Sequence, residues 1–566
     1  MDKWTFPELE YKRPDVDEVR NIITKHTEAV RNAKSGDDVL DAIFSLDRTM
    51  SPVMDMGTLA SVRNTLDTTD EFYDKENEYI SQMMPTITPD IVAFSSAVEE
   101  SPFRKSVEER FGHQYFVRTE LQRKSFCEEN IPLMQKEALL TNEYQKIMAG
   151  CQIEFEGQTL NLYGIQKYFE NENRELRKKA WRAYSAFYQS NEERLEEIWS
   201  ELIEIRNQMG RNLGYENYIP LGYMNQGRTD YGAEEVAAFR EQVRQEIVPL
   251  CEKLYEAQAR RLGIDRTYCY DEGRIFPDGN ATPAGDDDFM IEKAREMYHD
   301  ISPETAEFID FMIDHKLMDL KNRPGKASTG YCTILASRKA PFVFSCFNQT
   351  KFDMEVLSHE LGHAFAFFRS LRSQELTDFA EVTTDIAEIH SMSMEQFAYP
   401  YAEGFFGKDA DKYRFAHLQD AVTFVPFGVA VDEFQHICYS KPELTPKERT
   451  YEWHKLEEKY MPWRKYDGDE FLERGGWWYH KLHIYLYPFY YINYTLTTMG
   501  ALEFKKKNIE DRENAWKDYL ALCDIGGRLS YLKTLELAHL SNPFEKGSVA
   551  RIVGPAKTIL ERDMNL

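Results

Sequence analysis

The chain has no apolar run long enough to cross a lipid bilayer. The longest candidate, from Ala421 to Val431, reaches about half of the required length and contains a proline. The first residues, MDKWTFPELEYKRPD, also lack the apolar core of a secretory signal. We therefore expect a cytoplasmic protein without a membrane segment.

A disulfide pattern and an excess of basic residues are lacking as well. The eight cysteines of this 566-residue chain are scattered and form no C-x-x-C pair, so we expect reduced thiols. Asp and Glu outnumber Lys and Arg by 96 to 69, and the resulting net charge of −27 disfavours nucleic acid as a partner. A G-x-S-x-G motif is absent too, so no serine nucleophile of that type is predicted.

One short motif carries most of the chemical information. In His359-Glu360-Leu361-Gly362-His363, the two histidines stand four residues apart and would stack on one face of a helix. Both imidazoles can then reach one zinc ion, and Glu360 can take a proton from water at the metal's open position. The motif predicts a metallopeptidase of the zincin type.

The residues around the motif favour the helix that it needs. Thr350 and Asp353 resemble a capping box at its start, and no proline or further glycine interrupts it up to Arg369. Apolar residues recur at the three- and four-residue steps of an amphipathic helix: Met354, Leu357, Leu361, Ala364, Phe365 and Phe368. The motif is therefore expected on a helix with one buried face.

A catalytic zinc usually takes three protein ligands, so one more must come from another segment. Residues Leu376 to Phe397 are expected to form a second helix with four acids, Glu381, Asp385, Glu388 and Glu395. Glu381, Glu388 and Glu395 are seven residues apart and share a face. Glu381 with Asp385 matches the E-x-x-x-D pattern of thermolysin-like enzymes, so spacing alone leaves the third ligand open.

H-E-L-G-H followed by E-I-H-S-M-S-M-E resembles the oligoendopeptidase F and thimet oligopeptidase superfamily of zinc metallopeptidases, which includes Pz-peptidase-like enzymes. The resemblance implies one zinc ion per chain, held by His359, His363 and Glu388. It also implies outer positions for Asp385 and Glu395, the latter able to orient a ligand histidine through its free ring nitrogen. His390 is expected to be a packing residue and not a fourth ligand.

The resemblance extends over about two thirds of the chain. YCTILASRKAPFVFSCFNQT, from Tyr331 to Thr350, predicts two short strands around a turn. Members of the superfamily carry a comparable strand pair before the zinc helix, and its edge receives the substrate backbone. A purely structural hairpin is the alternative. Two earlier segments, which begin GCQIEFEGQTLNLYGIQ and RNLGYENYIPLGYM, also look like oligoendopeptidase F.

A Tyr-rich segment, HKLHIYLYPFYYINYTLTTMG, lies far downstream between His480 and Gly500. In the resembling superfamily, a histidine and tyrosines of this region donate hydrogen bonds to the oxyanion beside the zinc. The pattern maps most simply onto His483, Tyr490, Tyr491 and Tyr494. The choice among Tyr487, Tyr490 and Tyr491 stays open, and an amphipathic aromatic core is the competing interpretation.

Helical patterns dominate the chain, so we expect a mainly α fold with a small antiparallel sheet beside the zinc helix. The sequence favours a helical region over residues 1–190 and a catalytic region over 191–566. The resemblance implies two helical lobes around a deep channel that admits short unfolded peptides. The expected function is endopeptidase cleavage of such peptides; the alternatives are a broad thermolysin-like protease acting on whole proteins and a helical scaffold with structural zinc.

Overall fold

The computed structural model describes residues 4–327, 329–348 and 350–565. The chain forms two compact units, each assembled from three separate segments. Unit 1 comprises Met1–Arg123, Thr282–Gly407 and Lys507–Leu540, and unit 2 comprises Lys124–Ala281, Lys408–Lys506 and Ser541–Leu566. Residue 190 lies inside the helix α8 (Arg174–Asn212), and the division of the sequence at that residue stays a prediction.

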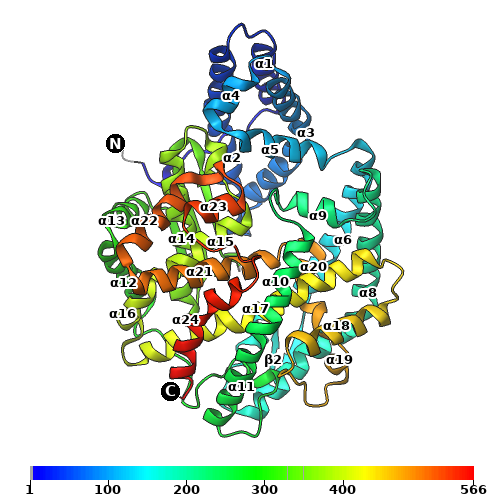
Figure 1. Cartoon of the computed structure of the whole chain (residues 1–566), viewed down its shortest axis with the longest axis vertical. Coiled ribbons are helices and arrows are strands. Elements are labelled where there is room, and N and C mark those ends of the chain that lie inside the picture. The colour runs from blue at the N-terminus through cyan, green and yellow to red at the C-terminus, as the bar shows by residue number, and fades with distance from the viewer. Residues whose placement is uncertain (1–3, 328, 349, 566) are drawn as a thin grey trace. The chain divides into compact units, whose positions relative to one another are not determined.

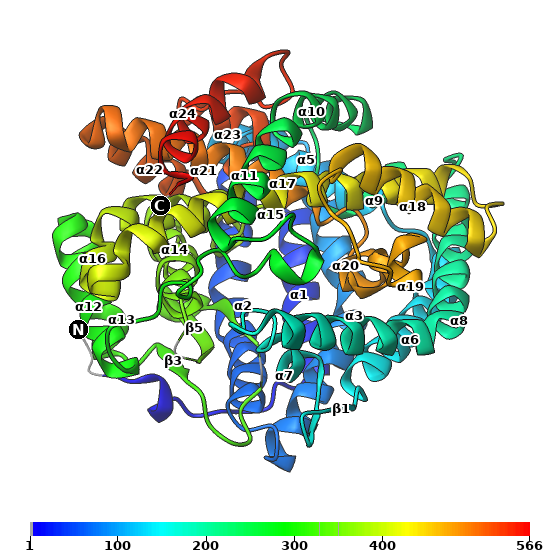
Figure 2. The same cartoon turned by 90° about the horizontal axis from the view of Figure 1, so that it is seen from below.

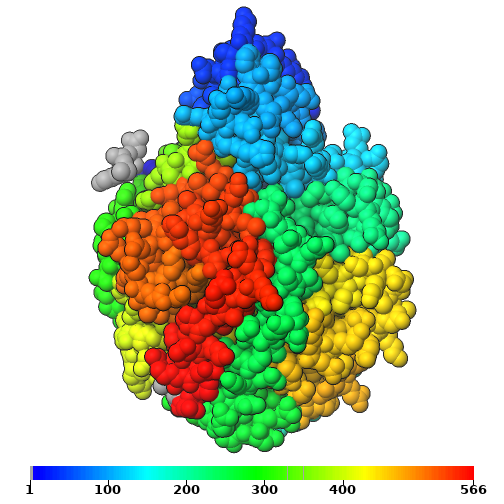
Figure 3. Space-filling view, in the orientation of Figure 1, coloured from blue at the N-terminus to red at the C-terminus, as the bar shows by residue number. Residues whose placement is uncertain are grey.

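Unit 1 begins with a group of helices, drawn in blue in Figure 1 and close-packed on the face that Figure 3 shows. Side chains cap the first of them: the Asp15 carboxylate accepts from Glu18 N–H at the start of α1, and Ser35 forms a capping box with Asp38 before α2. The helices of unit 1 are α1 (Val16–Arg31), α2 (Gly36–Leu66), α3 (Glu71–Glu100), α4 (Arg104–Phe111), α5 (His113–Lys124), α12 (Asp287–Ile301), α13 (Pro303–Asp314), α14 (Phe352–Ser373), α15 (Thr384–Ala398), α16 (Ala402–Phe406), α22 (Arg512–Ile525) and α23 (Tyr531–Leu537).

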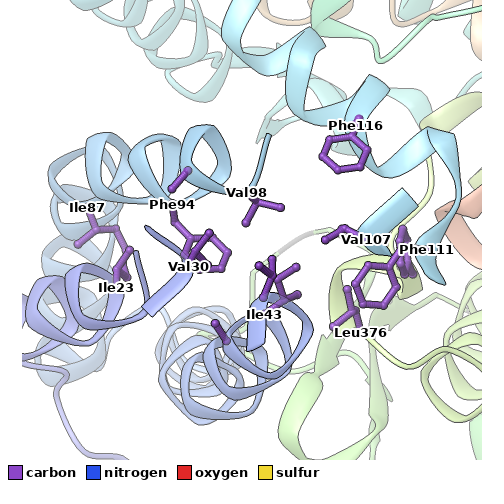
Figure 4. Packing of buried hydrophobic residues seen from close by; sticks show 14 of the residues in the cluster. Ile23, Val30, Ile43, Ile87, Phe94, Val98, Val107, Phe111, Phe116 and Leu376 are labelled. Carbon is purple, nitrogen blue, oxygen red and sulfur yellow. The ribbon is translucent and has the colours of Figure 1, made fainter. Parts of the chain in front are cut away.

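The apolar faces of α1 to α5 enclose a core that also receives a distant segment. Figure 4 shows Ile23, Ile43 and Phe111 in this core, together with Leu376 from the connection that follows α14. Phe379, three residues after Leu376, belongs to the same buried cluster. The N-terminal helices therefore fix the chain between α14 and α15 by burying its apolar side chains.

A three-stranded sheet lies beside α14, as Figure 2 shows for two of its strands. The strand order is β3-β5-β4, with β3 (Met318–Lys321) parallel and β4 (Tyr331–Leu335) antiparallel to β5 (Ala340–Phe347). The strand pair predicted from residue 331 onward is present, but β3 makes the sheet mixed and not antiparallel throughout. β4 is an edge strand, because β5 is its one neighbour in the described sheet.

Unit 2 is built around long helices, with a two-stranded hairpin, β1 (Ile153–Phe155) and β2 (Gln158–Leu160), as its one sheet in the described residues. Gly210 lies inside α8, two residues before the helix ends at Asn212. A Cβ at Gly210 would stand 2.4 Å from the Asn217 carbonyl oxygen, so the glycine is needed for close approach. The other helices of unit 2 are α6 (Ile131–Ala149), α7 (Leu162–Gln166), α9 (Ile219–Asn225), α10 (Ala233–Glu246), α11 (Val248–Leu262), α17 (Ala410–Ser440), α18 (Pro446–Tyr460), α19 (Glu470–Glu473), α20 (Leu482–Leu486), α21 (Ile492–Glu510) and α24 (Ser548–Asp563).

The mainly α fold with small sheets is confirmed. The predicted start of the second helix is wrong. The second helix begins at Thr384 and not at Leu376, because a short 3-10 turn (Thr377–Ala380) and an extended stretch precede it.

No helix among the described residues is both long and apolar enough to span a membrane.

Candidate metal centre

α14 presents the two histidines of the H-E-x-x-H motif on one side. The rings of His359 and His363 lie 5.0 Å apart between centroids and are nearly perpendicular. The opposite side of α14 is buried through Met354, Leu357 and Leu361, which fixes the helix against the rest of unit 1. The expected capping box is not formed, because Lys351 is the N-cap residue and makes no side-chain cap bond.

Glu388 on α15 completes a cluster with these histidines. Glu388 Oε2 lies 3.2 Å from His359 Nε2 and 3.5 Å from His363 Nε2. Zinc bonds of about 2.1 Å at tetrahedral angles place neighbouring ligand atoms about 3.4 Å apart. Within the described residues, this is the one group of three or more His, Cys, Asp or Glu side chains close enough to hold a metal ion. Donor types and spacing both fit zinc.

Two further side chains fix the donors of this cluster. His359 Nδ1 lies 2.6 Å from Glu395 Oε1, which leaves Nε2 to face Glu388 and His363. The buried Ser391 hydroxyl donates to Glu388 Oε2 over 3.1 Å. Such contacts set the orientation and tautomer of metal ligands.

The electrostatics of the cluster favour a positive charge at its centre. Burial lowers the pKa of His359, but the adjacent Glu388 and Glu395 carboxylates prevail and raise it well above its usual range. Burial raises the pKa of Glu388, but the charges and hydrogen bonds of His363 and His359 hold it far below its usual range. Both pKa shifts arise because two carboxylates lie next to the imidazoles. A divalent cation at the centre of the cluster would balance the negative charge of the carboxylates.

Gly362 allows the two ligand-bearing helices to approach each other. A Cβ at this position would lie 2.8 Å from Ser391 Cα and 2.9 Å from Met394 Cβ, both on α15. Contacts this short do not occur between real side chains. The glycine inside the motif therefore sets the distance between the histidines of α14 and Glu388 of α15.

Glu360 faces the edge of the sheet. Its Oε1 lies 3.8 Å from the position that a Cβ would take at Gly330, the residue before β4. Its charge adds to burial in raising the pKa of the Cys332 thiol on β4 well above the usual range. The half-buried Glu360 carboxylate is thus close to both the zinc motif and the start of an edge strand.

The other acidic candidates occupy different places. Glu381 is exposed and lies in extended backbone before α15, outside the ligand cluster. Asp385 is buried in the first turn of α15 and accepts a hydrogen bond from the Thr383 hydroxyl. His390 is buried with Nε2 3.3 Å from the Leu522 carbonyl oxygen, as expected for a packing residue.

The Tyr-rich segment belongs to unit 2, where His483, Tyr491 and Tyr494 form one aromatic group. The His483 ring centroid lies 4.8 Å from that of Tyr491 and 6.1 Å from that of Tyr494. Burial, helped by the charge of Lys481, lowers the pKa of His483 to about 3, so the imidazole is neutral at pH 7. Tyr487 is exposed, whereas Tyr491 is buried.

Sequence reasoning missed Lys481, whose ammonium donates to the Tyr491 hydroxyl oxygen over 2.9 Å. The segment is also not one continuous helix, because a turn at Phe489, with φ of 61°, separates α20 from α21. Arg228 holds this turn by donating to the Phe489 carbonyl over 2.6 Å and to the Asn493 amide oxygen over 2.9 Å. Pro488, directly before this turn, is a local signal of the break, since a proline inside a helical pattern ends or kinks the helix.

Known proteins share both the sequence pattern and the fold. The model for the peptidase M3 N-terminal domain matches residues 6–126, and that for peptidase family M3 matches residues 167–274 and 292–553. No curated protein sequence matched the chain.

Solved structures similar to the whole chain carry related descriptions. PZ peptidase A with an inhibitor is 40% identical with a TM-score of 0.93, over 99% of this chain and 100% of that one. A putative oligoendopeptidase F is 42% identical with a TM-score of 0.93, over 100% of both chains. Another, from Bacillus anthracis strain Ames, is 38% identical with a TM-score of 0.89, again over 100% of both chains. The chain therefore belongs to peptidase family M3, the oligoendopeptidase F group of metallo-oligopeptidases.

Proposed function

We propose that the protein is a zinc-dependent endopeptidase that hydrolyses internal bonds of short, unfolded oligopeptides. The observation that carries the proposal is the convergence of His359, His363 and Glu388 within 4.8 Å, with Glu360 beside the edge strand β4. Two imidazoles and one carboxylate are the ligand set of many catalytic zinc sites.

The ligand roles follow from the donor atoms. His359 and His363 would bind one zinc ion per chain through Nε2, and Glu388 through Oε2. When bound, zinc lowers the pKa of a water molecule toward neutrality and polarises the carbonyl of the scissile bond. Glu395 would hold the His359 ring in place through Nδ1, and Ser391 would steady the Glu388 carboxylate.

Glu360 is proposed as the general base. Its carboxylate is next to the ligand cluster in sequence and faces β4, where a peptide can align. It would take the proton of the attacking water and pass it to the leaving amine. General acid–base catalysis of this kind contributes roughly 10²- to 10⁴-fold to the rate.

His483, Tyr491 and Tyr494 are proposed to donate hydrogen bonds to the developing oxyanion, on the strength of the family pattern. Their chemistry suits the role: the neutral His483 imidazole and the tyrosine hydroxyls are donors without a full charge. The buried His483 Nδ1 makes no hydrogen bond to another described residue.

The preference for short peptides is supported by the descriptions of the similar structures, two of which are named as putative oligoendopeptidase F. An exposed strand edge binds an extended chain through its main-chain groups, which folded proteins do not offer. We therefore expect cleavage of unfolded oligopeptides and not of whole folded proteins.

Cleavage of an internally quenched oligopeptide and of casein, each with and without a chelator, tests the proposal. We expect zinc-dependent cleavage of the peptide, loss of activity on chelation, recovery on zinc addition, and little action on casein. Comparable cleavage of casein would favour a broad thermolysin-like protease. A zinc-loaded protein that cleaves neither substrate would favour a scaffold with structural zinc.

A further inference from the structure

The hydrogen-bonding pattern of the sheet defines which groups of β4 face outward. Val343 N–H donates to the Leu317 carbonyl over 2.9 Å, so the polar groups of Val343 point to the β3 side. Val343 is paired with Cys332 across β4 and β5, and Pro341 is paired with Ile334. In an antiparallel pair the bonded and non-bonded positions alternate, so the N–H and C=O groups of Cys332 and Ile334 point away from β5.

Helix α2 contacts β4 and the turn that follows it through one face. The Thr58 hydroxyl donates to the Ile334 carbonyl over 3.0 Å. Thr65, two turns later, has its hydroxyl 2.6 Å from the Tyr331 hydroxyl. Asp55, one turn earlier, accepts from Ser337 N–H over 3.3 Å in the turn after β4. Residues at these spacings share a helix face.

Thr58 occupies the place that a paired strand would need at Ile334. A neighbouring strand donates its N–H to an edge carbonyl from about 2.9 Å, and Thr58 Oγ1 already stands at that distance with α2 behind it. Cys332, in contrast, makes no main-chain bond to the described residues beyond the sheet. The charge of Glu360 also contributes, after burial, to the raised pKa of the Cys332 thiol.

We propose that Thr58 ends the part of β4 with which a substrate can pair. The peptide main chain then uses the outward groups of Cys332 and stops short of the Ile334 carbonyl. The inference rests on the proposed peptidase function and adds the residue that limits binding on one side of the cleaved bond. It makes the length limit on that side a property of the helix α2.

The alternation of a strand gives this proposal a sharp signature. Successive outward carbonyls of β4 are two residues apart, so the substrate N–H groups that face them are also two residues apart. One substrate N–H faces the Cys332 carbonyl, and the N–H two residues further toward Ile334 has no acceptor in the native protein. Removing the N–H that faces the Cys332 carbonyl therefore weakens binding, and removing the N–H that is two residues further has no effect.

A series of peptides in which single amides, other than the scissile one, are replaced by esters tests this directly. An ester removes one N–H with little change in shape, and loss of one such bond lowers kcat/KM by about 3- to 10-fold. The kcat/KM of each peptide is measured on the native protein, on Thr58→Ala and on Thr49→Ala. Each kcat/KM is divided by that of the unmodified peptide on the same protein. Thr49 matches Thr58 in type but lies on the opposite, exposed face of α2, where its hydroxyl bonds to Ser45 O of the same helix.

We expect Thr58→Ala to gain one further sensitive amide, two residues beyond the last one of the native protein, and Thr49→Ala to match the native pattern. Identical patterns in the native protein and Thr58→Ala would overturn the proposal, and so would the absence of any sensitive amide. Cleavage of the unmodified peptide by the native protein reports separately on the proposed function. A crystal structure with a non-hydrolysable peptide provides a second test. A peptide N–H that donates to the Ile334 carbonyl in that structure would contradict the proposal.

Discussion

At the scale of single residues, Glu360 offers the most direct test of the proposed chemistry. Glu360→Gln keeps the size of the side chain and removes its basicity, so we expect kcat to fall by roughly 10²- to 10⁴-fold. Zinc content should stay near one per chain, because Glu360 lies outside the ligand cluster. Glu355→Gln on the same helix, whose carboxylate is 3.4 Å from Lys351 Nζ, is the matched control. Near-native hydrolysis by zinc-loaded Glu360→Gln would remove Glu360 from the mechanism.

The identity of the third ligand is a second question at this scale. Glu388→Ala should lose most of the bound zinc, because Glu388 Oε2 lies within 3.5 Å of both histidines. Glu381→Ala should keep a stoichiometry near one, since Glu381 is exposed and outside the cluster. Metal analysis of both purified variants measures the difference, and the reverse result would support the thermolysin-like pattern.

Tyr494 is the tyrosine on which the proposed oxyanion contact is best tested. Tyr494→Phe removes one hydroxyl and keeps the ring, so the packing against His483 is retained. An interaction made only in the transition state changes kcat and leaves KM nearly constant. We expect kcat to fall by about 10- to 1000-fold, while Tyr451→Phe, at an exposed tyrosine, should have no effect. A lower melting temperature with native kcat would identify Tyr494 as a core residue.

At the scale of elements, the approach of α14 to α15 decides whether the ligands meet. Gly362→Ala would place a Cβ 2.8 Å from Ser391 Cα, so the two helices must separate. We expect a loss of about 1–3 kcal/mol in unfolding free energy, the usual result of overpacking, and weaker zinc binding. Gly404→Ala in α16 is the control, because its nearest heavy atom would be Lys293 Cδ at 3.8 Å. Native zinc affinity in Gly362→Ala would show that the helix spacing tolerates a methyl group.

The start of α15 shows why the second helix was predicted too long. The acids at seven-residue spacing suggested one continuous helix from Leu376, a purely local argument. In the structure, Leu376 and Phe379 are buried among the N-terminal helices, and Thr377 N–H donates to the Asp47 carboxylate over 3.0 Å. These partners are 260 or more residues away in sequence, so no local pattern could reveal them.

The α14 helix, in contrast, could be predicted because its signals are local. Its apolar stripe and the four-residue spacing of His359 and His363 lie within one segment. The strand pair β4 and β5 was found for the same reason, since a short turn joins its strands. β3 was missed because its four residues pair in parallel with a strand that follows in sequence only after β4. The contact of Thr58 with Ile334 likewise depends on folding across the chain.

At the scale of the whole molecule, the pH dependence of stability includes the effect of a buried acid that lies outside the candidate site. Glu457 on α18 in unit 2 is buried, and its Oε1 accepts hydrogen bonds from Trp453 Nε1 over 2.9 Å and from the Tyr466 hydroxyl over 2.5 Å. Burial raises the pKa of this carboxyl from its ordinary value of 4.5 to about 7. The folded protein therefore holds a proton that the unfolded chain releases near pH 4.5.

This difference gives Glu457 a predictable effect on the pH dependence of unfolding. Between about pH 4.5 and pH 7 the folded state binds more protons than the unfolded state at this residue, so stability falls as the pH rises through that window. A difference of 2.5 pKa units corresponds to about 3 kcal/mol at most. Glu457→Gln keeps an acceptor oxygen for both donors and removes the ionisation. We expect the variant to match the native protein at pH 4 and to be more stable than it by up to about 3 kcal/mol at pH 8.

Chemical denaturation of the native protein, Glu457→Gln and Glu458→Gln at pH 4, 6 and 8 measures the effect. Glu458 follows Glu457 in the same helix, but its side chain is 66% exposed and its partner His454 lies 3.7 Å away, so its substitution should change stability by less than about 1 kcal/mol at each pH. The quantity that tests the prediction is the difference in unfolding free energy between Glu457→Gln and the native protein, followed from pH 4 to pH 8. Other groups titrate in both proteins, so their effects cancel in this difference. A difference that stays constant from pH 4 to pH 8 would mean that the Glu457 carboxyl has the same pKa in the folded and unfolded states, and that its two hydrogen bonds cancel the effect of burial on that pKa.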